Sequence, residues 1–205
     1  MYTPTANKIE DREKIFGLIE TYGFATIVTD KEGIPSASHL PVLLNAKDGE
    51  FGSLRGHMAR ANEQWKHFDP AKEVLCIFHG PHSYISPSWY VSKVAVPTWN
   101  YATVHVYGYP KLEEGGEFLR KIVNDTTNKY EKVMESPWTM DFPENTVDSL
   151  LKAIVGFSIA ISRVEAKFKL GQNKSIEDQA SMLAALETSV GSDARALAEF
   201  IKLQI

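Results

Sequence analysis

The first third of the chain holds three short apolar runs separated by tight turns, and this pattern constrains the fold more than any other feature. The run at 24–29 is apolar and β-branched, as buried strands are, and turn residues follow at 30–33. A second run at 36–44 ends at the Asp48-Gly49 turn, and a third follows at 51–56. Loops this short permit antiparallel pairing, whereas parallel strands need long crossovers. The pattern therefore predicts a β-meander.

The remainder of the chain alternates between further strands and helices. In 101–109, aromatic residues and His105 alternate with small aliphatic residues, which predicts a strand with one aromatic and one apolar face. The other expected strands are 74–78 and 155–165. The expected helices are 8–22, 59–68, 113–133, 146–152 and two at the C-terminus. This order predicts an α+β fold with a barrel-like sheet, in a single domain over residues 1–205.

Polar residues mark the expected helix starts. Asn7 is expected to cap the first helix. Ser175 is expected to cap the first C-terminal helix, and Asp178 three positions later predicts a variant of the capping box. Ser192, directly after Gly191, is expected to cap the second.

Charge and composition narrow the function classes. The net charge is −4 and the pI about 5.9, so the chain lacks the basic footprint of a typical DNA-binding domain. Its single cysteine, Cys76, lies in an apolar run, which favours a buried thiol and a reducing, cytoplasmic environment. No apolar stretch approaches the roughly 20 residues of a membrane span, and no signal peptide is visible, so no membrane association is expected.

The segment 54–65 is a candidate anion site. A strand is expected to end at Gly56 and a helix to begin near Ala59, which would leave free backbone N–H groups at a helix N-terminus. Arg60 could fork onto a phosphate there, with His57 and Asn62 in the same turn. The alternative is that Arg60 is a solvated helix residue and His57 only ends the strand.

Three further segments are candidates for contact with a flat, polar-edged ligand. The segments 80–90 and 97–101 combine tryptophan and tyrosine with proline, serine and glycine, a mixture that a core strand would not need. The alternative is that these aromatic residues fill a dimer interface. The turn at 167–174 offers Lys169, Gln172 and Asn173, although a basic loop that only caps a helix is the alternative there.

Metal and nucleophile chemistry have little support in the sequence. None of the six histidines forms a helical i, i+4 pair beside a carboxylate, and no cysteine pair exists, so no metal site is expected. Three serines lie near His82, but no G-x-S-x-G elbow is present.

Several long segments of the chain form a recognisable set. They are Met1-Tyr2, 24–26, 56–62, 80–90, 97–101, Val104-His105 with Gly108, and 169–174. In this order they resemble the PaiB family of FMN-binding negative transcriptional regulators, over nearly the whole chain. That family is similar to the split-barrel flavin-binding proteins typified by pyridoxine 5′-phosphate oxidase. The resemblance implies a mainly β, six-stranded antiparallel FMN-binding split β-barrel with flanking helices, a homodimer, and FMN across the subunit interface.

The resemblance also implies which residues would contact FMN. They are His39, His57, Arg60, Asn62, Tyr84, Ser86, Trp99, Lys169, Gln172 and Asn173. Arg60 and Asn62 would take the phosphate, Tyr84 and Ser86 would meet the ring or ribityl chain, and the 169–173 loop would approach the ring. The chain departs from the family pattern at Gly171, where serine is common, and at Gln179, where a basic residue is common.

Three functions remain open at this point. The resemblance implies an FMN-binding negative regulator, although the chain has no recognisable helix-turn-helix or basic stripe, so direct DNA contact lacks support. The alternative is an enzyme, either a flavin-dependent oxidoreductase related to pyridoxine 5′-phosphate oxidase or a haem-binding or haem-degrading split-barrel protein, with His82 or His105 as a proton donor. The third is a structural dimer that has lost its ligand.

Overall fold

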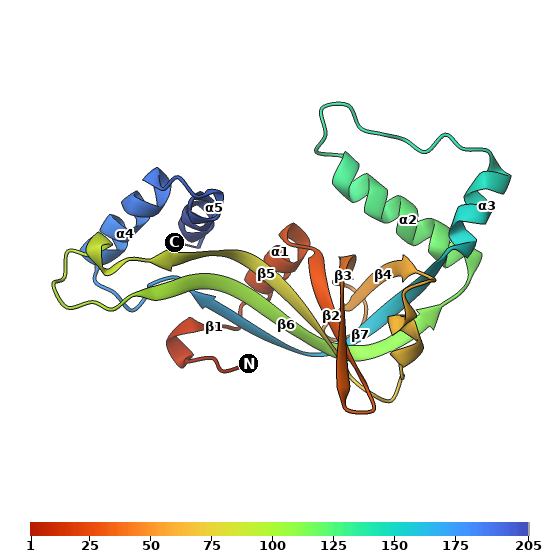
Figure 1. The fold of residues 1–205 in the computed structure, drawn as a ribbon, viewed down its shortest axis with the longest axis horizontal. Helices are drawn as coiled ribbons and strands as arrows, with labels where there is room; N and C mark the ends of the chain where they lie inside the picture. Colours follow the sequence, from red (N-terminus) through yellow and green to blue (C-terminus); the bar gives the residue numbers. More distant parts are fainter. Residues whose placement is uncertain (205) are drawn as a thin grey trace. The chain divides into compact units, whose positions relative to one another are not determined.

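The computed structural model describes residues 1–204 and shows a mixed α+β fold (Figure 1). The chain divides into two compact units. Unit 1 comprises Met1–Leu18, His79–Val104 and the C-terminal part from Glu165, and unit 2 comprises Ile19–Phe78 and His105–Val164. Three long strands contribute residues to both units. The expectation of one domain over 1–205 stays a prediction.

The predicted β-meander is confirmed in unit 2. Strands β2 (Phe24–Lys31), β3 (Ile34–Asn45) and β4 (Ser53–Ala59) pair antiparallel in chain order. Glu32 and Gly33, at the turn between β2 and β3, both have positive φ (55° and 85°), as a type I′ hairpin requires.

The antiparallel sheet has seven strands, whereas six were expected. Its order is β1-β7-β4-β3-β2-β5-β6, and an additional pairing of β7 with β6 closes the six longer strands into a ring. The extra strand is the two-residue β1 (Lys8–Ile9), which pairs with the β7 residues Lys167 and Ala166. It lies in a stretch that the sequence pattern assigned to a helix.

The other strands are longer than their apolar runs suggested. They are β5 (Val74–Ile85), β6 (Thr98–Glu113) and β7 (Ile154–Lys169). The predicted alternation in β6 is confirmed, because Ala102, Val104 and Val106 are at most 1% exposed while the aromatic residues of the opposite parity are partly exposed. Cys76 of β5 is fully buried, and burial raises the pKa of its thiol to about 12, as expected for an unreactive cysteine.

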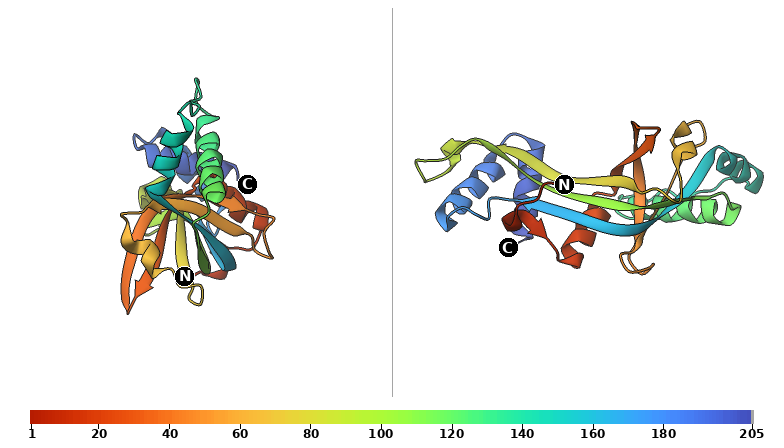
Figure 2. Two further views of the ribbon diagram at one scale, coloured as in Figure 1. Left: turned by 90° about the vertical axis from the view of Figure 1, so that its right-hand side faces the viewer. Right: turned by 90° about the horizontal axis from the view of Figure 1, so that it is seen from below.

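Helices α2 (Gly116–Glu131) and α3 (Glu144–Lys152) belong to unit 2 and lie side by side (Figures 1 and 2). Leu119, Val147 and Leu151 form the buried cluster between them. Arg120 of α2 reinforces this packing through ion pairs to Glu144 (2.7 Å) and Asp148 (2.9 Å) of α3. α2 also packs on β3 and β4, which positions the cavity described below.

In unit 1, α4 (Ile176–Thr188) and α5 (Ser192–Lys202) pack against each other (Figure 1). Their apolar faces form one buried cluster with Ile85 and Tyr90. The 3-10 helix η3 (Pro87–Trp89) lies against α4.

None of the helices within residues 1–204 has the length and apolar character that a membrane span requires.

Two of the expected helices differ from the structure. The first is shorter: α1 covers Arg12–Thr21, and the backbone N–H groups of Glu13 and Lys14 donate to the Asp11 carboxylate, so Asp11 and not Asn7 caps it. The helix expected at 59–68 is wrong. β4 continues to Ala59, and only a 3-10 helix η2 (Glu63–His67) follows.

The C-terminal caps were partly right. Ser175 caps α4 through a bond from the Asp178 backbone N–H (3.2 Å). The Asp178 carboxylate does not complete a capping box, because it accepts bonds from the Ser92 backbone N–H (2.9 Å) and hydroxyl (2.7 Å). These bonds lower the Asp178 pKa. The N-cap of α5 is Gly191, not Ser192.

Candidate functional site

Arg60, the expected phosphate anchor, is bound to the protein backbone. Its Nε donates to the carbonyl oxygen of Lys152 (2.9 Å) and its Nη2 to that of Ile154 (3.0 Å). Its backbone N–H donates to the carbonyl of Ala153 (2.8 Å). The Nη1 atom is 4.0 Å from Glu114. Arg60 thus joins the turn after β4 to the start of β7, and the only helical element in this turn is the 3-10 helix η2, which begins at Glu63.

Asn62 has a structural part in the same turn. Its Oδ1 accepts a bond from the Gln64 backbone N–H (3.1 Å), which caps η2, and its Nδ2 donates to the Ser38 hydroxyl (2.8 Å). Gln64 itself is buried, and its Nε2 donates to the carbonyls of Ile27 (2.9 Å) and Ser36 (3.0 Å). The polar groups of this turn therefore tie η2 to β2 and β3.

The two candidate histidines of unit 2 differ in their surroundings. His39 is exposed on β3, with its ring centroid 6.4 Å from that of Phe24. His57 is half-buried on β4, and its Nδ1 is buried with no hydrogen-bond partner within residues 1–204. Burial lowers the pKa of His57, which keeps its imidazole neutral near pH 7. A buried ring nitrogen without a partner fits an acceptor or donor on a ligand.

In unit 1, β5 and β6 present a cluster of exposed rings. The Trp99 centroid is 6.1 Å from Tyr84, edge to face, and 6.3 Å from His82. Trp99 is 54% and Tyr84 is 44% exposed, which is unusual for such large apolar groups. Ser86 follows Tyr84, and its hydroxyl caps η3 through the Ser88 backbone N–H (3.3 Å). These rings offer a flat surface to a partner or a planar ligand.

The turn after β7 supplies the other predicted residues. The Lys169 ammonium donates to the Thr98 hydroxyl and to the Trp99 carbonyl (2.9 Å), so the structure does bring Lys169 and Trp99 together. Gln172 is used within the turn: its Nε2 donates to the carbonyls of Ala6 (2.9 Å) and Phe168 (2.6 Å). Asn173 is exposed.

Gly171 is required by the backbone of this turn. Its φ is +86°, and a Cβ there would lie 3.2 Å from the Met182 methyl group. A serine at this position would be strained in the present conformation. The departure from the family pattern is therefore built into the local geometry.

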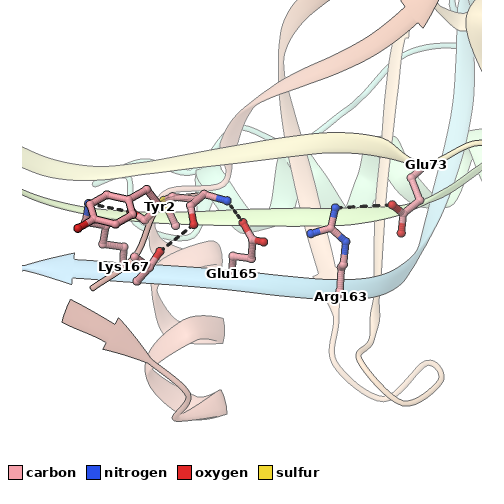
Figure 3. Close-up of polar contacts among 7 residues, drawn as sticks. Tyr2, Glu73, Arg163, Glu165 and Lys167 are labelled. Carbon is pink, nitrogen blue, oxygen red and sulfur yellow. Dashed lines mark hydrogen bonds and ion pairs between the residues drawn. The ribbon is translucent and has the colours of Figure 1, made fainter. Parts of the chain in front are cut away.

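Strand β7 carries polar contacts that the sequence did not suggest (Figure 3). In unit 1, the N-terminal ammonium of Met1 pairs with Glu165, and the buried Lys167 donates to the Tyr2 carbonyl (3.1 Å). In unit 2, Arg163 lies over the Tyr107 ring (3.3 Å to the centroid). Arg163 also pairs with Glu73 at 3.7 Å. The alternation of charges along β7 was the only available signal.

The ten predicted residues divide between the two units. Four lie in unit 2, and they are His39, His57, Arg60 and Asn62. Six lie in unit 1, and they are Tyr84, Ser86, Trp99, Lys169, Gln172 and Asn173. No group of three or more potential metal ligands is found within residues 1–204.

Residues 1–163 match a family model described as "Putative FMN-binding domain". The chain is 37% identical over 203 residues to Protease synthase and sporulation protein PAI 2 of Bacillus subtilis, which covers 98% of this chain and 97% of the relative. It is 34% identical over 194 residues to an uncharacterized protein of Emericella nidulans, with 77% of each chain covered.

Two solved structures share the fold at low sequence identity. The FAD and heme binding protein from Mycobacterium smegmatis is 13% identical, with a TM-score of 0.61 over 85% of this chain and 79% of that one. A protein from Bacteroides thetaiotaomicron described as a "putative 5-nitroimidazole antibiotic resistance protein" is also 13% identical, with a TM-score of 0.57 over 78% of this chain and 85% of that one.

Proposed function

The chain belongs to the PaiB family, whose model is described as an FMN-binding domain, and from this premise we propose that it is a cytoplasmic, FMN-binding negative regulator of transcription. The observation that carries the proposal is the match to PAI 2 of Bacillus subtilis along 98% of the chain. The flavin would lie at the interface of a homodimer. The exposed rings of unit 1 support this arrangement, because interfaces are enriched in aromatic residues.

The residues of unit 1 fit a flavin best. Trp99 and Tyr84 would contact the planar ring system, and the nearby Lys169 ammonium would donate to its polar edge. Ser86, Gln172 and Asn173 would contribute from the adjoining turns, and for Gln172 this requires exchange of its present backbone bonds. Bound FMN would supply redox chemistry, and the protein would position it.

The residues of unit 2 would contribute differently from the sequence-based expectation. His57 has an unpartnered buried Nδ1 and could bond a ligand directly, and His39 is exposed on the neighbouring strand. Arg60 and Asn62 could reach a phosphate only in competition with the bonds they already make. We therefore propose that Arg60 adds at most a weak contact to the phosphate, through its Nη1 edge, where Glu114 is 4.0 Å away.

An absorbance spectrum of freshly purified protein, followed by titration with FMN, tests the flavin proposal. A flavin spectrum, or saturable uptake of one FMN per chain, is expected. Trp99→Ala should weaken FMN binding by about 5- to 150-fold, because base- and ring-stacking contacts are worth roughly 1–3 kcal/mol. Trp138→Ala, at a comparably exposed ring of unit 2, is the control and should leave FMN affinity unchanged. A colourless protein that takes up no FMN would contradict the proposal.

The regulatory role needs a separate measurement. The net charge of −4 does not favour DNA, so we expect regulation to be indirect. Binding to promoter DNA across a salt series, with and without FMN, decides the point: tight binding that weakens steeply with salt would show direct repression instead.

The second candidate is a flavin-linked oxidoreductase. The observation in its favour is His82, an exposed titratable group 6.3 Å from the Trp99 ring. Steady-state oxidation of reduced nicotinamide by FMN-loaded protein, abolished in His82→Gln with FMN affinity intact, would establish it. A haem spectrum in the purified protein would favour the haem alternative. The absence of any bound chromophore would favour the ligand-free dimer.

A further inference from the structure

Unit 2 contains a cavity of about 770 Å³ that none of the proposed flavin residues lines. It lies where α2 packs on β3 and β4. Leu43, Leu44 and Val133 make up its apolar part, and Arg55, Lys129 and Lys132 are its cations. This volume is within the range of small-molecule pockets, and an apolar wall with a few placed charges is their usual composition.

Arg55 carries a donor that the protein does not use. Its side chain is only 24% exposed, and its Nε is buried with no hydrogen-bond partner within residues 1–204. Its Nη2 is 3.7 Å from Asp125, too far for a hydrogen bond. A buried guanidinium donor without an acceptor is costly, and a bound anion would satisfy it.

Lys129 is a second cation in an unfavourable position. Burial lowers the pKa of its ammonium, and repulsion from Lys132 lowers this pKa further. Attraction to Glu20 acts in the opposite direction and raises the pKa. The backbone leaves room for the Lys129 head, because a Cβ on Gly23 would lie 3.1 Å from its Nζ and 3.2 Å from the Tyr130 hydroxyl. Two donors thus converge beside Gly23 at the cavity.

The charges of the lining favour an anion. Arg55, Lys129 and Lys132 outnumber Glu20 and Asp125 by one, in a chain whose overall charge is −4. Asp125 is also shared with Lys121 at 3.2 Å, so it does not neutralise Arg55 alone.

We propose that this cavity is a binding site for a small organic anion, a phosphate monoester or carboxylate with an apolar body, and that it is separate from the flavin site. Arg55 and Lys129 hold the anionic group, Lys132 adds to the positive potential, and Leu43, Leu44 and Val133 contact the apolar body. The Tyr130 hydroxyl donates to the same group.

Calorimetric titration with phenyl phosphate and, separately, with benzoate tests the proposal. Saturable binding of at least one of them, at one site per chain, is expected, and the one bound more tightly identifies the head group. Arg55→Leu and Lys129→Met should each weaken that binding about tenfold or more, as loss of a charge-assisted bond predicts. Inorganic phosphate should bind more weakly than phenyl phosphate.

The matched control is Arg120→Gln, which removes an arginine of the same unit that pairs with Glu144 and Asp148 and does not line the cavity. It should leave the affinity for the probe unchanged. Circular dichroism confirms that each variant is folded, and Lys129→Met carries the test alone if Arg55→Leu does not fold.

Three results would overturn the proposal. The first is the absence of saturable binding by either probe. The second is equal loss of affinity in Arg120→Gln and in the cavity variants. The third is displacement of the probe by FMN together with loss of FMN binding in Arg55→Leu, which would make the cavity part of the flavin site. Failure to bind FMN at all would leave this proposal standing, because the probes are titrated into flavin-free protein as well.

Discussion

Arg55 lies on β4 and Arg60 lies in the turn that follows it, yet their side chains differ in how many of their donors are already bonded. The Arg60 side chain is 43% exposed, but its Nε and Nη2 are bound to backbone carbonyls of 152–154. The Arg55 side chain is 24% exposed, but its Nε has no partner. Availability to a ligand therefore follows from the acceptors that the fold already provides, and not from exposure. The turn after β4 is structural, whereas Arg55 within β4 keeps an unused donor.

Gln64→Ala should give the largest effect and would test whether the turn is structural. It removes a buried donor from the carbonyls of Ile27 and Ser36, so the free energy of unfolding should fall by about 2–4 kcal/mol. Urea denaturation measures this, and binding of FMN and phenyl phosphate at 10 °C should be unchanged. A loss below about 0.5 kcal/mol is typical of an ordinary surface substitution. Such a result would contradict the proposal that the turn stabilises the fold.

Arg60→Leu sharpens the comparison most directly. Loss of two charge-assisted bonds to carbonyls should lower the free energy of unfolding by about 1.5–3 kcal/mol, with FMN affinity reduced less than tenfold. Arg60→Lys, which keeps the charge but not the fork, is the control and should lose stability as well. Intact stability with a large loss of FMN affinity would instead make Arg60 the phosphate anchor.

The pH dependence of stability should report on His57. Its pKa is lowered in the folded state, so the unfolded chain binds the proton more readily. The free energy of unfolding should therefore fall as the pH drops below about 6.5 and approaches the lower folded-state pKa. His57→Gln should flatten this part of the profile. A profile that this substitution leaves unchanged would show that His57 does not titrate differently on folding.

Arg55→Leu should have the smallest effect on stability. It removes a donor that has no partner and a long ion pair, in which Nη2 lies 3.7 Å from Asp125. The free energy of unfolding should therefore change by less than about 0.5 kcal/mol. The same variant should lose the phenyl phosphate site. A stability loss as large as that of Arg60→Leu would mean that Arg55 is structural too, and the contrast between the two arginines would disappear.

Much of the sheet could be predicted from local pattern. The runs at 24–29 and 36–44 and the Gly33 turn specify a hairpin, because side-chain alternation and turn geometry are set by neighbouring residues. The alternation in 101–109 likewise identified the buried face of β6. The ends of the elements were less predictable. Strands β5 and β7 continue through polar residues, which are extended because they pair with other strands.

The wrong helix at 59–68 shows where local pattern fails. Ala59 is extended because it pairs with Ile154 of β7, a partner far away in sequence. The 3-10 helix that follows is held by Gln64, whose acceptors lie on β2 and β3. Helix propensity is a weak preference of fractions of a kcal/mol per residue, and tertiary bonds override it.

The family blocks correctly identified the fold, and the candidate site was only partly accessible. Tyr84, Trp99 and Lys169 could be grouped by type and position, and the structure places each of them beside at least one of the others. Of the cavity residues, Arg55 lies in the 54–65 segment without having been singled out there, and Lys129 lies in none of the candidate segments. Both line one cavity because α2 packs on β4.

The sequence alone determined the strand pattern, the antiparallel pairing of β2 with β3 and of β3 with β4, and the membership of the chain in its family. The strand pattern and the pairing depend on residues that are close in the chain, and the family membership depends on long segments of sequence that can be matched directly. The tertiary structure alone decided which polar groups are already bonded and which are left without a partner. The reason is physical: a hydrogen bond needs its acceptor within about 3 Å, and for Arg60 and Arg55 the acceptors that are present or absent come from distant parts of the chain.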